Sequence, residues 1–146
     1  MIVIRDAAPE DHFLWRFLWG QYCAFYKAEV TEYVTAKTWA RILDPASPIS
    51  CLMAFEGEEP LGFATYHAHP STWSTADDCY LEDLFVAQSA RGKGIGRALI
   101  DALREIGQTR GWNRLYWHTD ADNHPARRLY DSYALSDGAL RYRIKL

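Results

Sequence analysis

The stretch Tyr80–Arg110, YLEDLFVAQSARGKGIGRALIDALREIGQTR, holds a strand, a glycine-rich basic loop and a helix in direct succession. We expect the strand over the short apolar run that ends in Leu84-Phe85-Val86, because such a run is typical of a strand buried on both faces. From Ile95 onward, apolar residues repeat at the spacing of one helical face. The stretch therefore predicts a loop of phosphate size held between a buried strand and a helix.

The loop Arg91–Gly96 has the composition of an anion site. Its three glycines let the backbone turn N–H groups toward a ligand. The helix that begins near Ile95 adds unpaired N–H groups and the positive end of its dipole. Three cations, Arg91, Lys93 and Arg97, make a pyrophosphate a natural guest. An ordinary tight turn with exposed basic residues is the alternative, and the GxxxxGK(S/T) and GxGxxG nucleotide motifs are both absent.

The loop also carries a family resemblance. Arg91-Gly92-Lys93-Gly94-Ile95-Gly96, after the strand Leu84-Phe85-Val86, resembles the acetyl-CoA signature Q/R-x-x-G-x-G/A of the GCN5-related N-acetyltransferases (GNAT). The resemblance implies that the loop amides bind the CoA pyrophosphate and that the strand pairs its backbone with the pantetheine arm. The cofactor-binding residues expected on these grounds are Leu84, Phe85, Val86, Arg91, Gly92, Lys93, Gly94, Ile95, Gly96, Arg97 and Asn123.

A second match lies downstream. Asn123-His124-Pro125-Ala126-Arg127-Arg128-Leu129-Tyr130 is similar to the family pattern N-x-x-A-x-x-x-Y. The resemblance implies that Asn123 contacts CoA and that Tyr130 returns a proton to the departing thiolate. On the residues alone, a tyrosine at this spacing is more typical of a helix core. The chain continues with Ser132-Tyr133-Ala134 where many members have Lys-x-Gly-Phe.

Two carboxylates interrupt the central strand. Unpaired burial of Glu82 or Asp83 would cost about several kcal/mol, so either they meet cations and solvent or they serve an acceptor pocket. Successive strand residues point to opposite faces, so both can serve one pocket only at a bulge. Tyr80-Leu81-Glu82-Asp83, after Gly62-Phe63-Ala64-Thr65-Tyr66 and Trp73, looks like the diamine and thialysine acetyltransferase branch. That resemblance implies that Glu82 is a water-assisted base and that Asp83 orients the substrate; the alternative bases are His67, His69 and His118.

The N-terminal third is strongly aromatic. A helix over residues 12–27 would carry Phe13, Phe17, Gly20 and Ala24 on one face. The other face would carry Trp15, Trp19, Tyr22 and Tyr26, and one of the two faces must be core. We expect the second stripe to line either a substrate cleft or a subunit contact. The substrate-binding residues expected are Asp83, Trp19, Tyr22, Tyr26 and Trp73.

The remaining segments complete one α/β domain over residues 1–146. Strands are expected at 2–5, 50–56, 60–69, 114–119 and 139–146. A helix is expected over residues 35–43, capped by Thr35. A further helix is expected to begin after a cap at Asp122 or Asn123, to hold Pro125 in its first turn and to run through Ala126 to Tyr133. This order agrees with the GNAT fold, a mixed, mostly antiparallel twisted sheet of about six to seven strands flanked by about four helices.

Composition narrows the classes of function. A net charge of −3 argues against a general nucleic-acid binder. The three cysteines lack metal-ligand spacing and suggest reduced thiols in the cytoplasm. No apolar run approaches membrane-spanning length, and no metal is expected.

The function predicted is direct transfer of the acetyl group of acetyl-CoA to the primary amine of a small cationic molecule such as a diamine, polyamine or lysine-like compound. The alternatives are a peptide or protein amine, an aminoglycoside, or a module that binds acyl-CoA without turnover. A homodimer is expected by analogy with the family.

Overall fold

The computed structural model describes residues 1–146. Its centre is one sheet with the strand order β1-β2-β3-β4-β5. The strands are β1 Ile2–Asp6, β2 Ser50–Glu56, β3 Glu59–His69, β4 Asp78–Val86 and β5 Arg114–Tyr116. The first four strands pair antiparallel, and β5 lies parallel to β4. The mixed α/β class is confirmed, but the expected count of six to seven strands is wrong because the sheet has five.

The missing strand is the C-terminal one. Residues 139–146 alternate in the period of a strand, yet they form no regular structure. A strand needs a neighbour for its main-chain groups, and no main-chain group of residues 140–146 forms a hydrogen bond within the chain. The expected strand at 114–119 is likewise shorter, since β5 ends at Tyr116.

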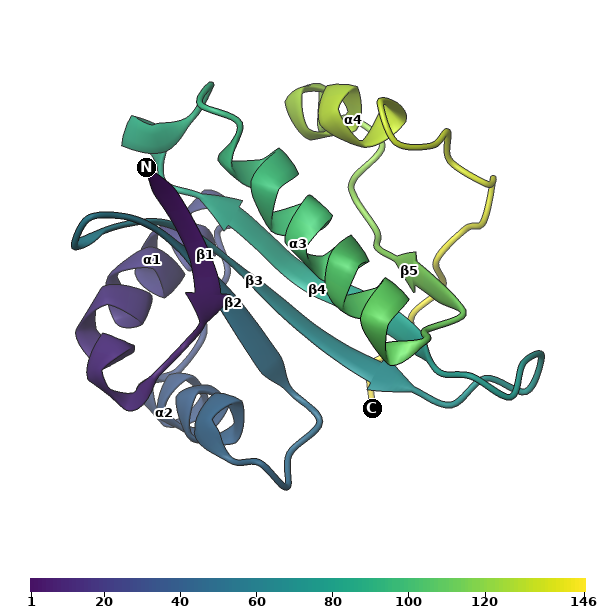
Figure 1. The fold of residues 1–146 in the computed structure, drawn as a ribbon, viewed down its shortest axis with the longest axis horizontal. Coiled ribbons are helices and arrows are strands. Elements are labelled where there is room, and N and C mark those ends of the chain that lie inside the picture. The colour runs from purple at the N-terminus through teal and green to yellow at the C-terminus, as the bar shows by residue number, and fades with distance from the viewer.

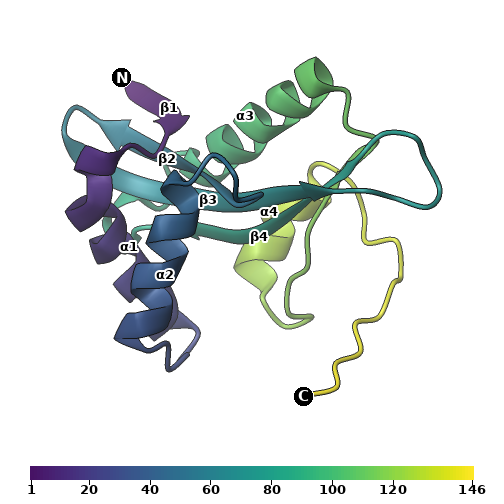
Figure 2. The ribbon, with the colours of Figure 1, turned by 90° about the horizontal axis from the view of Figure 1, so that it is seen from below.

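Four α-helices flank the sheet: α1 His12–Phe25, α2 Glu32–Leu43, α3 Ile95–Arg110 and α4 His124–Asp131. Figure 2 shows α3 on one face of the sheet and α1 with α2 on the opposite face. Figure 1 shows α4 beside the N-terminal part of α3. The α3 helix spans the residues that its periodicity predicts and ends at Gly111 in the left-handed conformation (φ 77°).

Three helices have a boundary that differs from the prediction: α2, α1 and α4, the last of which ends at Asp131 and not at Tyr133. The cap of α2 is Thr31, whose Oγ1 accepts a hydrogen bond from the amide of Val34 at 3.2 Å. Thr35 is buried inside α2 instead, where its Oγ1 accepts from Trp19 Nε1 at 3.1 Å. The α1 helix ends at Phe25, two residues early, and Lys27 follows with a positive φ of 53°.

The core forms where α1 and α3 cover the sheet. On α1, Trp15 and Leu18 are fully buried, whereas Phe13 and Phe17 remain exposed. The stripe that contains Trp15 is therefore the core face, and Trp19 and Tyr22 pack against the same core. The expectation that this whole stripe lines a cleft or a contact is wrong for Trp15. The three cysteines are free thiols, and Cys51 and Cys79 are buried.

Candidate active site

The edge of β4 is open where the cofactor arm is expected. β5 pairs with β4 only from Asp78 opposite Arg114 to Tyr80 opposite Tyr116. Beyond Tyr80 the two strands have no register partners, so the β5-facing main chain of residues 81–86 has no strand neighbour. An extended ligand arm can add to such an edge by main-chain hydrogen bonds. Leu84, Phe85 and Val86, which are expected to pair with pantetheine, belong to this open edge.

The basic loop continues directly from this edge. Gly92 and Gly94 adopt positive φ angles of 80° and 77°, and Gly94 caps α3 without any side-chain hydrogen bond. None of the amide groups of residues 92–97 donates a hydrogen bond within the chain. These free donors, at the positive end of a 16-residue helix, form an anion-binding cradle. Ile95 is buried beneath it and anchors the first turn in the core.

The cations of the loop have different surroundings. Arg91 Nε donates to the carbonyl oxygen of Val86 at 3.3 Å, and its guanidinium lies 5.3 Å from the centre of the Phe25 ring. Arg97 donates to Ser132 Oγ at 2.7 Å and lies over the ring of Tyr133, so it links α3 to the end of α4. Lys93 is exposed and has no partner within the chain. Lys93 is therefore the cation of this loop that is free to meet a phosphate.

The helices α3 and α4 meet closely at Gly96. A Cβ atom at this position would lie 3.1 Å from the Cδ2 of Leu129, closer than nearly all such contacts. Gly96 thus serves packing as well as the loop motif. The contact holds α4, the helix that carries Tyr130, against the first turn of α3.

A bulge interrupts β4 at the two carboxylates. The register of β3 and β4 shifts between Thr65, opposite Asp83, and Tyr66, opposite Leu81. Glu82 therefore has no partner in β3, and the alternation of side chains is interrupted between Glu82 and Asp83. Both carboxylates can serve one pocket only if β4 has a bulge between them, and the structure has a bulge at this position.

The surroundings of the two carboxylates differ strongly. Glu82 is about half exposed, and its Oε1 lies 3.3 Å from Nε2 of His67. Asp83 is only 9% exposed and accepts a hydrogen bond of 2.7 Å from the phenol of Tyr22. Burial raises the pKa of Asp83 to about 6, against the opposing effect of the Tyr22 hydrogen bond, and the charge of Glu82 raises it further. The site thus holds one hydrated carboxylate and one buried carboxylate that titrates near neutral pH.

Tyrosines of α1 and α4 complete this region. Burial, followed by the charge of Asp83, strongly raises the pKa of Tyr22. Tyr26 is partly exposed and packs edge-on to Tyr22 with ring centres 5.0 Å apart. Tyr130 packs edge-on to Trp117 at 5.4 Å, and burial, with a smaller effect of Tyr26, raises its pKa to about 12. Tyr130 is therefore a protonated phenol at neutral pH, as a proton donor must be.

Asn123 and Trp19 make hydrogen bonds that support the fold, and Trp73 lies in an exposed loop. Asn123 caps α4, since its Oδ1 accepts from the amide of Ala126 at 3.5 Å. Trp19 bridges α1 and α2 through its bond to Thr35. Trp73 is 96% exposed in the loop before β4, at the opposite end of that strand from Asp83. The structure does not bring Trp73 to the site.

The two other histidines considered as bases, His69 and His118, each contact a tyrosine hydroxyl. His69 Nε2 lies 2.6 Å from the hydroxyl of Tyr116, and His118 Nδ1 lies 3.2 Å from the hydroxyl of Tyr80. Only His67 contacts one of the two carboxylates. The sequence did not predict the packing of Phe25 on Arg91 or of Trp117 on Tyr130. The two residues of each pair are far apart in the sequence, so no periodic pattern indicates the contact.

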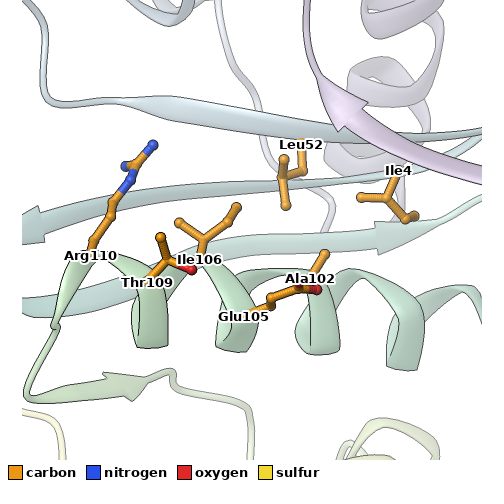
Figure 3. A pocket seen from close by; sticks show the side chains of 7 residues that line it. All are labelled: Ile4, Leu52, Ala102, Glu105, Ile106, Thr109 and Arg110. Carbon is orange, nitrogen blue, oxygen red and sulfur yellow. The ribbon is translucent and has the colours of Figure 1, made fainter.

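A separate hollow lies on another part of the surface. Figure 3 shows it between the second half of α3 and strands β1 and β2, on the face of the sheet that α3 covers. It measures about 410 Å³, and none of the predicted site residues lines it. Its lining residues are Ile4, Leu52, Ala102, Glu105, Ile106, Thr109 and Arg110. The candidate site is instead the open edge of β4 with the loop beyond it.

No group of three or more histidine, cysteine, aspartate or glutamate side chains is arranged to hold a metal ion. None of the helices combines the length and apolar character that crossing a membrane demands.

The fold and the open strand edge with its anion cradle define an enzyme that takes its acyl group from a CoA thioester. A sequence profile of the Acetyltransferase (GNAT) family matches residues 12–134, most of the chain. The protein belongs to this family and is an acetyl-CoA-dependent N-acetyltransferase.

Three relatives illustrate the range of similarity. The D-amino-acid N-acetyltransferase HPA3 of Saccharomyces cerevisiae is 34% identical over 97% of this chain and 89% of its own. The thialysine N-epsilon-acetyltransferase of Caenorhabditis elegans is 35% identical over 55% of this chain and 49% of its own. The integron cassette protein VCH_CASS6 of V. cholerae, a solved structure, superposes with a TM-score of 0.81 at 27% identity, over 99% of this chain and 92% of that one.

Proposed function

We propose that the protein acetylates the primary amine of a small cationic molecule, such as a diamine, a polyamine or a lysine-like compound. The observation that carries this proposal is the bulge at Glu82 and Asp83, which lies in the part of β4 that β5 leaves unpaired. Two carboxylates, one of them buried against Tyr22, favour an ammonium group over a neutral or anionic acceptor. Tyr22 and Tyr26 add aromatic surface that suits a cation.

In this proposal the donor is held by main-chain groups. Leu84, Phe85 and Val86 pair with the pantetheine arm, and the free amides of the loop bind the pyrophosphate with help from Lys93. Asn123 contacts CoA near its thiol end. These assignments draw support from the open edge of β4 and from the unpaired amides of residues 92–97.

The reaction then needs three proton transfers. An ammonium group cannot attack, so it first loses a proton through a water molecule to the carboxylate of Glu82. The free amine attacks the thioester carbonyl carbon, and an amide group of β4 near Phe85 stabilises the oxyanion. The C–S bond breaks, and the thiolate takes the proton of Tyr130, while the attacking nitrogen gives up its second proton, which returns to the Tyr130 phenolate through water and leaves a neutral amide. Asp83, fixed by Tyr22, holds the acceptor in line; no covalent enzyme intermediate forms.

A second candidate acceptor is the α-amino group of a free amino acid. It is favoured by the relative that is named for acetylation of D-amino acids, because the similarity extends over 97% of this chain. A free amino acid adds a carboxylate to the ammonium group, so it would need a cation beside Glu82 and Asp83. Arg91 is a candidate, because it lies over Phe25 and donates to the carbonyl oxygen of Val86 at the end of β4.

Thiol release from acetyl-CoA against a panel of amines distinguishes these acceptors. The panel holds diamines, polyamines, lysine and thialysine, D- and L-amino acids, aminoglycosides and short peptides. The proposal predicts the highest kcat/KM for acceptors with two or more cationic groups. Preference for D-amino acids supports the second candidate, and tight binding of acetyl-CoA without turnover of any amine overturns both in favour of a sensor.

We also propose that the protein works in the cytoplasm as a homodimer, without nucleic acid, membrane or metal. The three free thiols support the compartment, and the net charge of −3 supports the absence of a nucleic-acid partner.

A further inference from the structure

The carboxylate of Glu82 contacts a single polar side chain. Its own side chain is 52% exposed, the bulge leaves it without a partner in β3, and its one hydrogen-bond partner is His67, whose Nε2 lies 3.3 Å from Oε1. A glutamate surrounded by water samples several rotamers, whereas a group that removes a proton from an acceptor needs a fixed place. The contact with His67 is therefore what can fix Glu82.

His67 is itself held in place by the sheet. It lies on β3 directly opposite Tyr80, and the two rings meet edge-on with their centres 5.5 Å apart and their planes at 82°. The hydroxyl of Tyr80 lies in turn 3.2 Å from Nδ1 of His118. The titratable groups that face the His67 ring are Glu82, Asp83 and Tyr80, all on β4. A ring supported by two paired strands can orient a neighbouring side chain more precisely than a loop residue can.

The ring nitrogens of His67 are used differently from those of His69. In His69 both are engaged, because Nδ1 lies 2.9 Å from the carbonyl oxygen of Pro70 and Nε2 lies 2.6 Å from the hydroxyl of Tyr116. In His67 only Nε2 has a partner within the chain. An ionised carboxylate accepts hydrogen bonds but donates none, so Nε2 of His67 carries the hydrogen and donates it to Glu82. One oxygen of Glu82 is thus occupied and the other stays free.

Stability of the fold is a weak reason for this pair. Both side chains reach solvent, with 29% of His67 and 52% of Glu82 exposed, and pairs exposed to this extent contribute little to folding. The same exposure suits a group that must exchange protons with water. The surroundings of the pair therefore favour a role in the reaction over a role in the fold.

We propose that His67 is a positioning residue for the base: its Nε2–H holds Oε1 of Glu82, so that Oε2 accepts the proton of the ammonium group through a water molecule. The ammonium nitrogen loses one proton, Oε2 gains it, and the N–H bond of His67 stays intact. The protonated Glu82 then returns its proton to solvent. His67 takes no proton itself, and its role rests on the proposed function, in which Glu82 is the base.

Steady-state thiol release with the best acceptor of the amine panel tests this role on the full chain. His67→Gln keeps an N–H donor with the reach of Nε2 and should retain kcat within about threefold. His67→Phe keeps a ring against Tyr80 but removes the donor, so its kcat should fall roughly tenfold while its KM for acetyl-CoA stays unchanged. His12→Gln changes an exposed histidine at the start of α1 and is the matched control. Equal losses in the Gln and Phe variants of His67 would overturn the role, because the donor would then not be what matters.

A double variant shows whether His67 acts through Glu82. His67→Phe combined with Glu82→Gln should be no slower than Glu82→Gln alone, since no base is left to position. A further fall of about tenfold in the double variant would mean that the two residues act independently, and it would overturn the role of His67. The loss in His67→Phe should also shrink at high pH, where the free amine no longer needs a base, and a loss that is equal at all pH values would indicate packing alone.

Two comparisons separate this role from the proposed function. Wild-type activity of His67→Phe beside an impaired Glu82→Gln overturns the role of His67 alone, whereas full activity of Glu82→Gln overturns the proposed function as well. Thermal unfolding and acetyl-CoA binding of each variant, both unchanged, show that a lost rate is not the result of a lost fold. His67→Asn, whose amide is too short to reach Oε1, should behave like His67→Phe and replaces it if the Phe variant unfolds.

Discussion

The phenol of Tyr22 donates a hydrogen bond of 2.7 Å to the carboxylate of Asp83, across 61 residues of sequence. This contact ties α1 to β4 at the point where β4 leaves β5. It holds a carboxylate that is 9% exposed in a fixed position, and burial raises its pKa to about 6. The pair therefore links the aromatic N-terminal helix to the proposed acceptor site. Replacement of either residue should change both the stability and the activity of the protein.

Asp83→Asn should stabilise the protein at neutral pH. A carboxyl group whose pKa is raised from 3.8 to about 6 by folding contributes stability below pH 4, and this contribution is lost as the pH rises through 6. The neutral amide avoids that loss, so the variant should gain about 1–3 kcal/mol at pH 7.5 and little at pH 4. Urea unfolding at both pH values measures the difference. A variant that is less stable than the wild type at pH 7.5 would refute the account of Asp83.

The same carboxylate should set an acidic limit on activity. Below about pH 6 Asp83 becomes protonated and loses its attraction for an ammonium group, so kcat/KM for a diamine should fall while acetyl-CoA binding stays constant. Asp83→Asn should lower kcat/KM at pH 7.5 and remove this limb. If kcat/KM of the variant still falls below about pH 6, another group causes the fall.

Tyr22→Phe should act through Asp83. Loss of a hydrogen bond to a charged group costs about 1.5–3 kcal/mol, so kcat/KM at pH 7 should fall roughly tenfold, and the acidic limb should move to higher pH because the ionised form loses its donor. Tyr33→Phe is the matched control, since Tyr33 is 76% exposed on α2 and should leave the profile unchanged. A lower rate in Tyr22→Phe with an unshifted limb would mean that Tyr22 supports only packing.

Gly94→Ala should weaken acetyl-CoA binding. Gly94 adopts a φ of 77° as the cap of α3, and a Cβ atom in the left-handed region costs about 1–2 kcal/mol. Relief of that strain would move the free amides of the cradle. Gly57→Ala carries the same cost at φ 61° in the β2–β3 turn, so it should lower stability to a similar extent without changing acetyl-CoA affinity by calorimetry. Equal affinity in both variants would argue against the cradle.

The sequence predicts the local parts of this site well. The start that periodicity predicts near Ile95 is confirmed by α3, which spans Ile95–Arg110, because an amphipathic pattern flanked by glycines is a local signal. The hairpin of β2 and β3 is similarly local. The prediction that Thr35 caps α2 is wrong because the hydroxyl of Thr35 accepts a tertiary hydrogen bond from Trp19. The residue that caps α2 is Thr31.

The long-range parts could not be predicted. The bulge that frees Glu82 arises from the register of β3 on β4, and no spacing within either strand reports it. The pairing of Tyr22 with Asp83 depends on how α1 crosses the sheet. The pattern of residues 140–146 predicts a strand, but a pattern does not identify its partner, and within one chain there is none.

The central claim is that the protein transfers acetyl groups to a cationic amine by means of Glu82 and Tyr130. The most direct measurement is amine-dependent release of the CoA thiol by the wild type, Glu82→Gln and Tyr130→Phe. Glu59→Gln on β3 and Tyr33→Phe on α2 are the controls, because both side chains are exposed. We predict rapid release with a diamine, a fall of about 10²–10⁴ in kcat for each site variant, and unchanged acetyl-CoA affinity. Release from Glu82→Gln should recover at high pH, where the amine no longer needs a base. Full activity in either site variant would contradict the account.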